Sequence, residues 1–409
     1  MRKRLIVGLL VLTLGWVCGP ARAAEDAAAP FLGKWAITLQ NINSSFAACW
    51  MDVFRKPDGS FDARLLWRYG SVLPVKSVKV ENGELQVVRT ESVQDPKTKN
   101  WQKVDCLYAM KLADGKAAGS VKNADGSVHQ FTGYRDVEKV DVAGTWNLDL
   151  MERQSRIVRR QLVLTQEGNK VAGTFSGDGL TVPIKSAKLD GDKLTFTFEW
   201  GPPANATAEF KGDKVSGTAS VAFSGERQRK PGQPIQLFSG KDLTGWHSRE
   251  PKEVPPRWEV KEGYMVPLKG ASDICSDQKF GDFKLHAEWY FPENDGNSGV
   301  YPRGLYEVQL LSDAGRPPNE HATGAIYSRT APTRNAAKPV HEWQTVDLTL
   351  VGRWITIAIN GETVLDNVHI DGITGGAIVG DENEPGPIML QAHGQAVRFR
   401  NVIVTPLLK

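Results

Sequence analysis

The stretch FKLHAEWYFPENDGNSGVYPRGLYEVQLLSD, residues 283–313, decides the fold of the C-terminal part of this chain. Within it, KLHAEWYF (284–291) and YEVQLL (306–311) alternate apolar residues with His, Glu and Gln. A period of two is the spacing of a β-strand that buries one face and exposes the other. IMLQAH (388–393) repeats the pattern further along the chain. These segments predict three strands of a β-sandwich, each with an apolar face and a polar face.

If these three strands are neighbours, their polar side chains share one concave surface. We expect that surface to be lined by Glu288, Glu307, Gln309, Gln391 and His393. The segments VDLTLVG (346–352) and RWITIAIN (353–360) are predicted to form the back sheet that covers the core. Six of the seven histidines lie within 233–409, and histidine exchanges protons near neutral pH, so this region is favoured for chemistry.

The first half of the chain also predicts small β-structures. Residues 31–140 and 141–230 each open with Gly-x-Trp in an alternating strand, FLGKWAITL and VAGTWNLDL. Turn pairs such as Asn82-Gly83 separate the following strands, and they accept the positive φ that tight hairpins need. We interpret the region as a repeated β-meander that forms either two small sheets or one closed, lipocalin-like barrel of about eight to ten strands. The whole chain is therefore predicted to be all-β.

Two segments outside these sheets have recognisable patterns. Residues 1–23 resemble a secretory signal, with basic residues at 2–4, an apolar run over 5–17 and Ala21-Arg22-Ala23 as a cleavage site. Residues 24–30 follow as a short leader. The polar stretch GERQRKPGQP (225–234) reads as a linker before a domain over 233–409. These features predict a periplasmic or secreted protein.

Removal of the signal would change the charge of the chain. It takes away four basic residues and no acid, so the formal charge falls from +3 to −1. The electrostatic basis for nucleic-acid binding is then lost, and we expect no nucleic-acid partner. No later segment is long and apolar enough to span a membrane.

Three cysteines follow the signal. Cys49 and Cys106 lie in the same N-terminal region and could pair in an oxidising compartment, which the sequence leaves open. Cys275 is expected to be buried as a small hydrophobic residue.

The C-terminal third resembles the 3-keto-disaccharide hydrolase domain family over residues 236–408. The resemblance rests on separated blocks in the same order: LFSGKDLTGW (237–246), NSGVYPR (297–303), HATGAIY (321–327) and GPIMLQAHG (386–394). It implies a concanavalin-like jelly-roll sandwich for this domain. The polar positions that the resemblance carries over are Glu288, Asn297, Ser298, Arg303, Glu307, Gln309, Tyr327, Glu342, Gln391, His393 and Arg400.

Members of the family act on glycosides whose glucose unit carries a ketone at C3. The ketone acidifies the hydrogen on C2, so a base can remove it and the bond from C1 to the leaving group then breaks. Such a site needs a base, an acid and a donor for the enolate oxygen. Glu307, His393 and Glu288 are the candidates for proton transfer, and Arg303 and Asn297 are the candidates for the oxyanion.

Other functions remain open at this stage. The domain could be a carbohydrate-binding lectin without activity, or a conventional glycosidase that uses Glu288 and Glu307. No cofactor is required by the elimination chemistry, and no zinc motif is present. Calcium held by loops through Asp273, Asp295 or Asp381 is an open alternative. The leaving group, and the choice between lyase and hydrolase, are not predicted.

Overall fold

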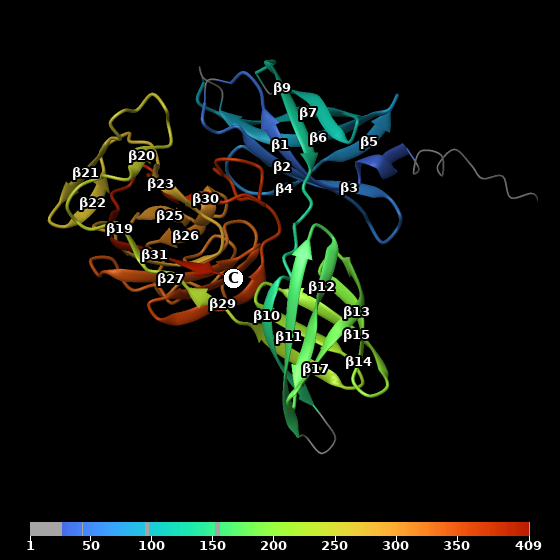
Figure 1. The fold of residues 1–409 in the computed structure, drawn as a ribbon. Helices are drawn as coiled ribbons and strands as arrows, with labels where there is room; N and C mark the ends of the chain where they lie inside the picture. The colour runs from blue at the N-terminus through green and yellow to red at the C-terminus, as the bar shows by residue number, and fades with distance from the viewer. Residues whose placement is uncertain (1–26, 43, 95–97, 124, 152–155, 409) are drawn as a thin grey trace, which may run out of the picture.

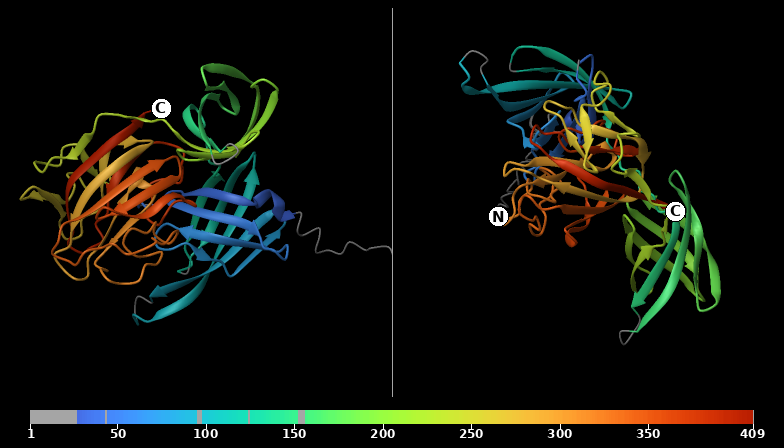
Figure 2. Two further views of the ribbon diagram at one scale, coloured as in Figure 1. Left: turned by 90° about the horizontal axis from the view of Figure 1, so that it is seen from below. Right: turned by 90° about the vertical axis from the view of Figure 1, so that its left-hand side faces the viewer.

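The computed structural model describes residues 27–42, 44–94, 98–123, 125–151 and 156–408. The predicted signal peptide and residues 24–26 of the predicted leader lie outside these residues. The described chain is built of β-strands in three units that lie against one another (Figures 1 and 2), which confirms the all-β class. Its helical segments are the 3-10 turns η1 (Ala29–Phe31) and η3 (Pro302–Gly304). No helix among these residues has the length and apolarity needed to cross a bilayer.

The first unit is one antiparallel sheet in the order β4-β3-β2-β1-β9-β8-β7-β6-β5. Its strands are β1 (Gly33–Leu39), β2 (Ala48–Arg55), β3 (Phe61–Trp67), β4 (Leu73–Pro74), β5 (Ser77–Glu81), β6 (Glu84–Gln94), β7 (Trp101–Ala113), β8 (Lys116–Lys122) and β9 (Val128–Arg135). Cys49 and Cys106 are both buried in its core, and Cys49 is a free thiol. Burial raises the pKa of the Cys49 thiol to about 12.

The second unit is a closed barrel in which the eight strands β10 to β17 follow chain order. They are β10 (Gly144–Met151), β11 (Ile157–Glu167), β12 (Lys170–Gly177), β13 (Leu180–Asp190), β14 (Lys193–Glu199), β15 (Pro203–Lys211), β16 (Lys214–Thr218) and β17 (Ala222–Arg227). The two meanders therefore form separate sheets and not one shared barrel. The physical reason is that each buries its own hydrophobic core.

The Gly-x-Trp segments play the same part in both units. Trp35 and Trp146 are fully buried, and each indole N–H donates to the carbonyl four residues earlier, at 2.8 Å to Phe31 and 3.0 Å to Val142. An arginine from the last strand of each unit lies over each ring. Arg135 is 4.7 Å from the Trp35 centroid and Arg227 is 4.4 Å from that of Trp146. Each tryptophan thus closes one end of its own core and is not left to line a ligand cavity.

The third unit is a two-sheet sandwich, which confirms the predicted jelly-roll architecture (Figure 1). One sheet has the order β21-β22-β31-β24-β27-β28-β29, with β18 and β19 also pairing with β31; the other has the order β20-β23-β30-β25-β26. The strands of the first are β18 (Lys230–Pro231), β19 (Ile235–Phe238), β21 (Trp258–Lys261), β22 (Tyr264–Pro267), β24 (Phe283–Tyr290), β27 (Gln344–Val351), β28 (Trp354–Ile359), β29 (Glu362–His369) and β31 (Arg398–Leu408). The strands of the second are β20 (Trp246–Ser248), β23 (Ile274–Phe280), β25 (Asn297–Tyr301), β26 (Val308–Leu311) and β30 (Gly386–Leu390).

The predicted linker is part of this folded structure. Residues 225–227 end β17, and Lys230–Pro231 pairs with Leu408 and Leu407 of the last strand. Since this pairing fixes residues 230–231 to the sandwich, the barrel and the sandwich are connected by a short ordered segment.

Buried ion pairs join the first unit to the sandwich. Arg353, in the β27–β28 turn, contacts Asp136 at 2.5 Å and Glu382 at 3.3 Å. The side chains of all three residues are at most 3% exposed. A buried charge is tolerated only when it is paired, so this contact restrains the segment that follows β9 against the sandwich.

We expect Arg353→Ala to destabilise the protein strongly. The substitution leaves Asp136 and Glu382 buried without their guanidinium, and breaking a buried pair in this way costs about 3–5 kcal/mol. Urea denaturation followed by tryptophan fluorescence measures the loss. Arg334→Ala is the matched control, because Arg334 pairs with Glu362 at 3.3 Å on an exposed surface. It should change the free energy of unfolding by less than about 0.5 kcal/mol. Equal effects of the two substitutions would contradict the assignment.

Candidate active site

The outer face of the five-stranded sheet carries the polar side chains that the sequence singled out. Val300 and Val308 pair across β25 and β26 and belong to the main core. Side chains alternate along a strand, so the neighbouring pair Gly299 and Gln309 belongs to the opposite, outer face. Glu307, directly before β26, lies on that face as well. The alternation seen in the sequence is therefore confirmed for these strands.

Glu307 is the most perturbed carboxyl of this face. It is 5% exposed, and burial raises its pKa to about 8, with Asp273 acting in the same direction. A hydrogen bond with Gln391 opposes the rise but does not cancel it. Gly299 makes room for the carboxyl, because a Cβ there would lie 2.8 Å from Oε1 of Glu307. The side chain is thus held as a mainly protonated acid at neutral pH.

The hydrogen bonds around Tyr301 agree with a protonated Glu307. The Tyr301 hydroxyl donates to the Gly375 carbonyl at 2.9 Å and accepts from Nε2 of Gln391 at 3.2 Å. A hydroxyl has one hydrogen, so toward Glu307 it has only a lone pair left. A protonated carboxyl can donate to that lone pair, whereas an ionised one cannot.

A row of amides runs from this acid toward the rim. Gln309 donates to Oδ1 of Asn297 at 3.3 Å, and Nδ2 of Asn297 lies 3.2 Å from Nδ1 of His393. The exposed His393 is also 3.1 Å from Oε1 of Gln395 through the same ring nitrogen. A hollow of about 330 Å³ opens beside Asn297 and Gln395. The row therefore begins at Gln309, two residues from the buried acid on the same face of the strand, and ends at a solvent-facing imidazole.

Several hydrogen-bonding groups of this face are held in place by the backbone or remain without a donor. The Ser298 hydroxyl donates to the Gln391 carbonyl at 2.8 Å and is fully buried. Oε1 of Gln309 and Oε1 of Gln391 are buried and accept no hydrogen bond from the described residues. Buried amide oxygens normally find a donor, and sugar hydroxyls are donors of the right kind.

A second charged pair lies beside Glu307, and the sequence did not point to it as part of this site. Arg249 contacts Asp273 at 3.2 Å, and Asp273 also accepts from the Ala392 N–H at 2.9 Å. Burial raises the pKa of Asp273, although Arg249 and this N–H counteract it. Arg249 lies far from the motif strands along the chain, so no spacing rule would have grouped it with Glu307.

The first unit builds one wall of the site. The guanidinium of Arg249 lies 3.7 Å from the centroid of Phe46, and Gly376 donates its N–H to the Arg68 carbonyl at 2.9 Å. Gly375 packs so closely on the first unit that a Cβ there would lie 2.3 Å from the Gly70 carbonyl oxygen. Gly375 also accepts from Tyr301, so the wall is one residue away from the hydrogen bonds of Glu307.

Glu288 does not join this site, and the prediction of one surface for all five polar residues is wrong in this respect. Its strand β24 pairs with β27 and β31, so it belongs to the back sheet. Glu288 contacts Arg400 at 2.6 Å and Asn401 at 2.6 Å on the outer side of that sheet. The strand has the right alternation, but alternation does not say which sheet a strand enters.

The remaining predicted residues are divided between the two sides. Arg400 also lies 3.9 Å from the centroid of the Trp343 ring on the back sheet. Glu342, which directly precedes Trp343 in the sequence, is exposed. Arg303 is buried, but it donates to the Gly352 carbonyl at 2.6 Å at another edge of the sandwich. Tyr327 stays near the site, since its N–H donates to the Glu307 carbonyl at 3.0 Å. Arg303 is thus not placed to act as an oxyanion donor.

The conventional glycosidase alternative is not supported by this geometry. Glu288 and Glu307 project outward from opposite sheets, and packed sheets are about 10 Å apart before the outward side chains are added. A glycosidase pair needs about 5–9.5 Å between its carboxyl groups. These two residues therefore cannot flank one glycosidic bond.

The loop aspartates considered for calcium have other contacts. Asp273 binds Arg249, and Asp381 accepts from the Asn383 N–H at 2.9 Å. Within the described ranges, no group of three or more His, Cys, Asp or Glu side chains is close enough to hold a metal ion. Cys275 is buried in the outer face with Tyr301 and Met389, and burial raises its pKa to about 12. It is a packing residue, as predicted.

Comparisons with known proteins concern the C-terminal sandwich. Residues 233–405 match the family model of the 3-keto-alpha-glucoside-1,2-lyase-like domain. A 3-keto-disaccharide hydrolase from Bacteroides thetaiotaomicron is 24% identical over 229 residues, which covers 42% of this chain and 78% of that relative.

Two solved structures of candidate glycosyl hydrolases from Parabacteroides distasonis are also similar. One is 30% identical in sequence, and the match covers 43% of this chain and 90% of the chain in that structure, with a TM-score of 0.38. The other is 22% identical, and the match covers 42% of this chain and 99% of the chain in that structure, with a TM-score of 0.34.

We expect Glu307→Gln to gain stability relative to the wild type as the pH rises. The folded carboxyl has a pKa of about 8 against an ordinary value of 4.5, so the folded protein binds this proton more tightly than the unfolded chain does. The wild type therefore loses stability through this group between pH 4.5 and pH 8, whereas an amide does not titrate. Melting temperatures of both proteins across that range measure the difference.

Glu288→Gln is the matched control for this series. Partial burial acts to raise the pKa of Glu288, but the hydrogen bonds from Asn401 and Arg400 have the larger effect. The pKa of Glu288 is therefore below its ordinary value. Its contribution is present at neutral pH and is lost in acid, so this variant should be less stable than the wild type at neutral pH and equal to it at low pH. Parallel curves for Glu307→Gln and the wild type would contradict a buried, protonated Glu307.

Proposed function

Because residues 233–405 belong to the 3-keto-alpha-glucoside-1,2-lyase-like domain family, we propose that this protein cleaves glycosides whose glucose unit carries a ketone at C3. The observation that carries the proposal is the buried Glu307, with its pKa raised to about 8, on the same sheet face as the row of amides that leads to His393. A carboxyl whose pKa is shifted in this way is typical of a site for proton transfer. The name of the relative from Bacteroides thetaiotaomicron points to the same class of substrate.

The proposed reaction is an elimination. A base takes the proton from C2, and the electrons of that C–H bond form the enolate with the C3 ketone. The enolate then returns its electrons, a double bond forms between C1 and C2, and the C1–O bond breaks. The leaving oxygen keeps the electrons of that bond and takes a proton from an acid. Addition of water across the double bond would complete a net hydrolysis.

The residues of the outer face support distinct roles in these steps. Glu307 holds a proton at neutral pH, so we assign it as the acid for the leaving oxygen. His393 is exposed at the outer end of this row, and we assign its imidazole as the base for C2. Asn297 and Gln309 form the amide row. Their amide groups replace Arg303 as the candidate donors to the enolate oxygen.

We further propose that the protein is exported. The support is the pattern of residues 1–23, with its basic start, apolar run and Ala21-Arg22-Ala23. Sequencing the N-terminus of the mature protein tests this, because export predicts a start after Ala23 and a start at Met1 would contradict it.

We expect a 3-keto-glucoside to be cleaved and the matching unoxidised glucoside to be left intact. Only the ketone acidifies the C2 hydrogen, so the elimination cannot begin on the plain sugar. Incubating the full-length protein with chromogenic versions of both substrates measures the release of the leaving group. Equal rates on both would rule out the elimination. Saturable binding of both without product would instead favour a lectin.

We expect Glu307→Gln and His393→Ala each to lower turnover of the 3-keto-glucoside at least about a hundredfold, the usual effect of losing a general acid or base. Gln keeps the shape of Glu307 and removes only its proton, which separates chemistry from packing. Glu288→Gln is the control, because that carboxylate lies on the other sheet. If activity falls only in proportion to melting temperature, or if all three variants stay within a few-fold of the wild type, the assignment is wrong.

A further inference from the structure

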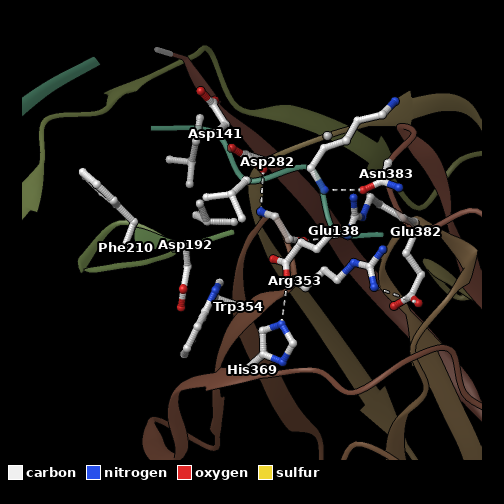
Figure 3. Close-up of a pocket in the computed structure, with 18 of the residues that line it drawn as sticks. Glu138, Asp141, Asp192, Phe210, Asp282, Arg353, Trp354, His369, Glu382 and Asn383 are labelled. Atoms are coloured by element: carbon white, nitrogen blue, oxygen red, sulfur yellow. Dashed lines mark hydrogen bonds and ion pairs between the residues drawn. The ribbon is translucent and has the colours of Figure 1, made fainter. Parts of the chain in front are cut away.

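The largest cavity described in the structure lies outside the candidate active site. It has a volume of about 870 Å³ and forms where the three units meet (Figure 3). Its walls come from the segment 136–141 after the first sheet, from turns at the end of the barrel, and from the 281–282 and 351–354 turns of the sandwich. None of the residues of the amide row lines it. Ligand sites commonly have this size and commonly lie between domains.

Ion pairs between the units hold the walls of this cavity together. Besides the pair of Arg353 and Asp136, Nε2 of His369 lies 2.8 Å from a carboxylate oxygen of Glu138, a contact that is drawn in Figure 3. Arg229, after the last barrel strand, contacts Asp282 of the sandwich at 2.8 Å. These pairs join the sandwich to the segment after the first sheet and to the barrel, so the cavity is bounded by fixed contacts on both of these sides.

The charges on the walls are already matched by one another. Arg353 is shared by Asp136 and Glu382, and Arg229 is shared by Asp213 and Asp282. Both guanidinium charges are thus balanced by carboxylates, while Nε of Arg353 and Nη1 of Arg229 are buried and have no hydrogen-bond partner among the described residues, so they stay available as donors. The lining therefore suits a neutral ligand that can both donate and accept hydrogen bonds.

A tryptophan supplies an apolar surface on one wall. Trp354 is partly exposed, and its ring meets the ring of His369 edge-on with 5.0 Å between centroids. Gly212 of the barrel approaches it so closely that a Cβ would lie 2.8 Å from Cβ of Trp354. Asp192, from the β13–β14 turn, lies on the barrel side of the cavity and faces this wall (Figure 3). A fixed indole beside a carboxylate matches the apolar face and the hydroxyls of a sugar ring.

We propose that this cavity is a second carbohydrate site, which binds a neutral mono- or disaccharide without cleaving it. Trp354 stacks on the ring, and Asp192 accepts hydrogen bonds from its hydroxyls. The site is separate from the Glu307 site, so it gives the chain a way to hold a sugar that is not being cleaved. The proposal does not depend on the nature of the reaction at Glu307.

The test uses the full-length Glu307→Gln protein, so that no turnover takes place, with methyl α-glucoside and maltose as probes. Ligand-observed NMR titration measures the dissociation constant. We expect saturable binding that is insensitive to ionic strength, because the ligand is neutral. Trp354→Ala in this background should weaken it about tenfold through loss of stacking, and Trp354→Phe should weaken it less. Asp192→Asn tests the hydrogen bonds without changing size.

Trp101→Ala is the matched control, since Trp101 is 70% exposed on β7 of the first unit, and it should leave binding unchanged. Cleavage by the Trp354→Ala variant of the otherwise wild-type protein should stay within a few-fold of normal. Absence of saturable binding, or equal affinity in the Trp354→Ala, Asp192→Asn and control variants, would overturn the proposal. So would a steep salt dependence, which indicates a charged ligand, or a loss of cleavage in Trp354→Ala at unchanged melting temperature, which would make the cavity part of the active site.

Discussion

The hydrogen bonds of the buried polar face on the five-stranded sheet determine much of the surrounding structure. Gln309, Gln391, Ser298 and Glu307 are polar residues that the fold removes from most solvent, and buried polar groups are costly unless they are paired. Tyr301 and the 374–377 segment supply several of those partners. Because Gly375 carries one of these bonds and also packs on Gly70, the first unit is held against the same face.

This arrangement links the accessory units to the chemistry of the sandwich. The wall made by Phe46 and the 68–70 segment restrains Arg249 and Gly376, and Arg249 in turn pairs with Asp273 beside Glu307. The raised pKa of Glu307 depends mainly on burial, and Asp273 acts in the same direction. A site built on a sandwich sheet thus depends on a separate sheet for its electrostatic environment.

The two N-terminal units show how far a short sequence pattern can be read. Gly-x-Trp occurs at the start of each, and in both the indole donates to the carbonyl four residues earlier and lies under an arginine of the last strand. The sequence predicted the repeated meanders. It left open whether the meanders share one barrel, because that depends on which strand edges pair.

The sequence by itself determined the strands, their buried and polar faces, and most of the polar residues of the site, because side-chain alternation and turn chemistry are local properties. Glu307, Gln309, Gln391 and His393 were found in this way, and Asn297 came from the family resemblance. Only the tertiary structure decided that Glu288 and Arg400 lie on the back sheet, that Arg303 points elsewhere, and that Tyr301, Arg249 and Asp273 surround Glu307. The physical reason is that sheet membership and burial depend on pairing between strands far apart in the chain, and period-two alternation is the same in either sheet.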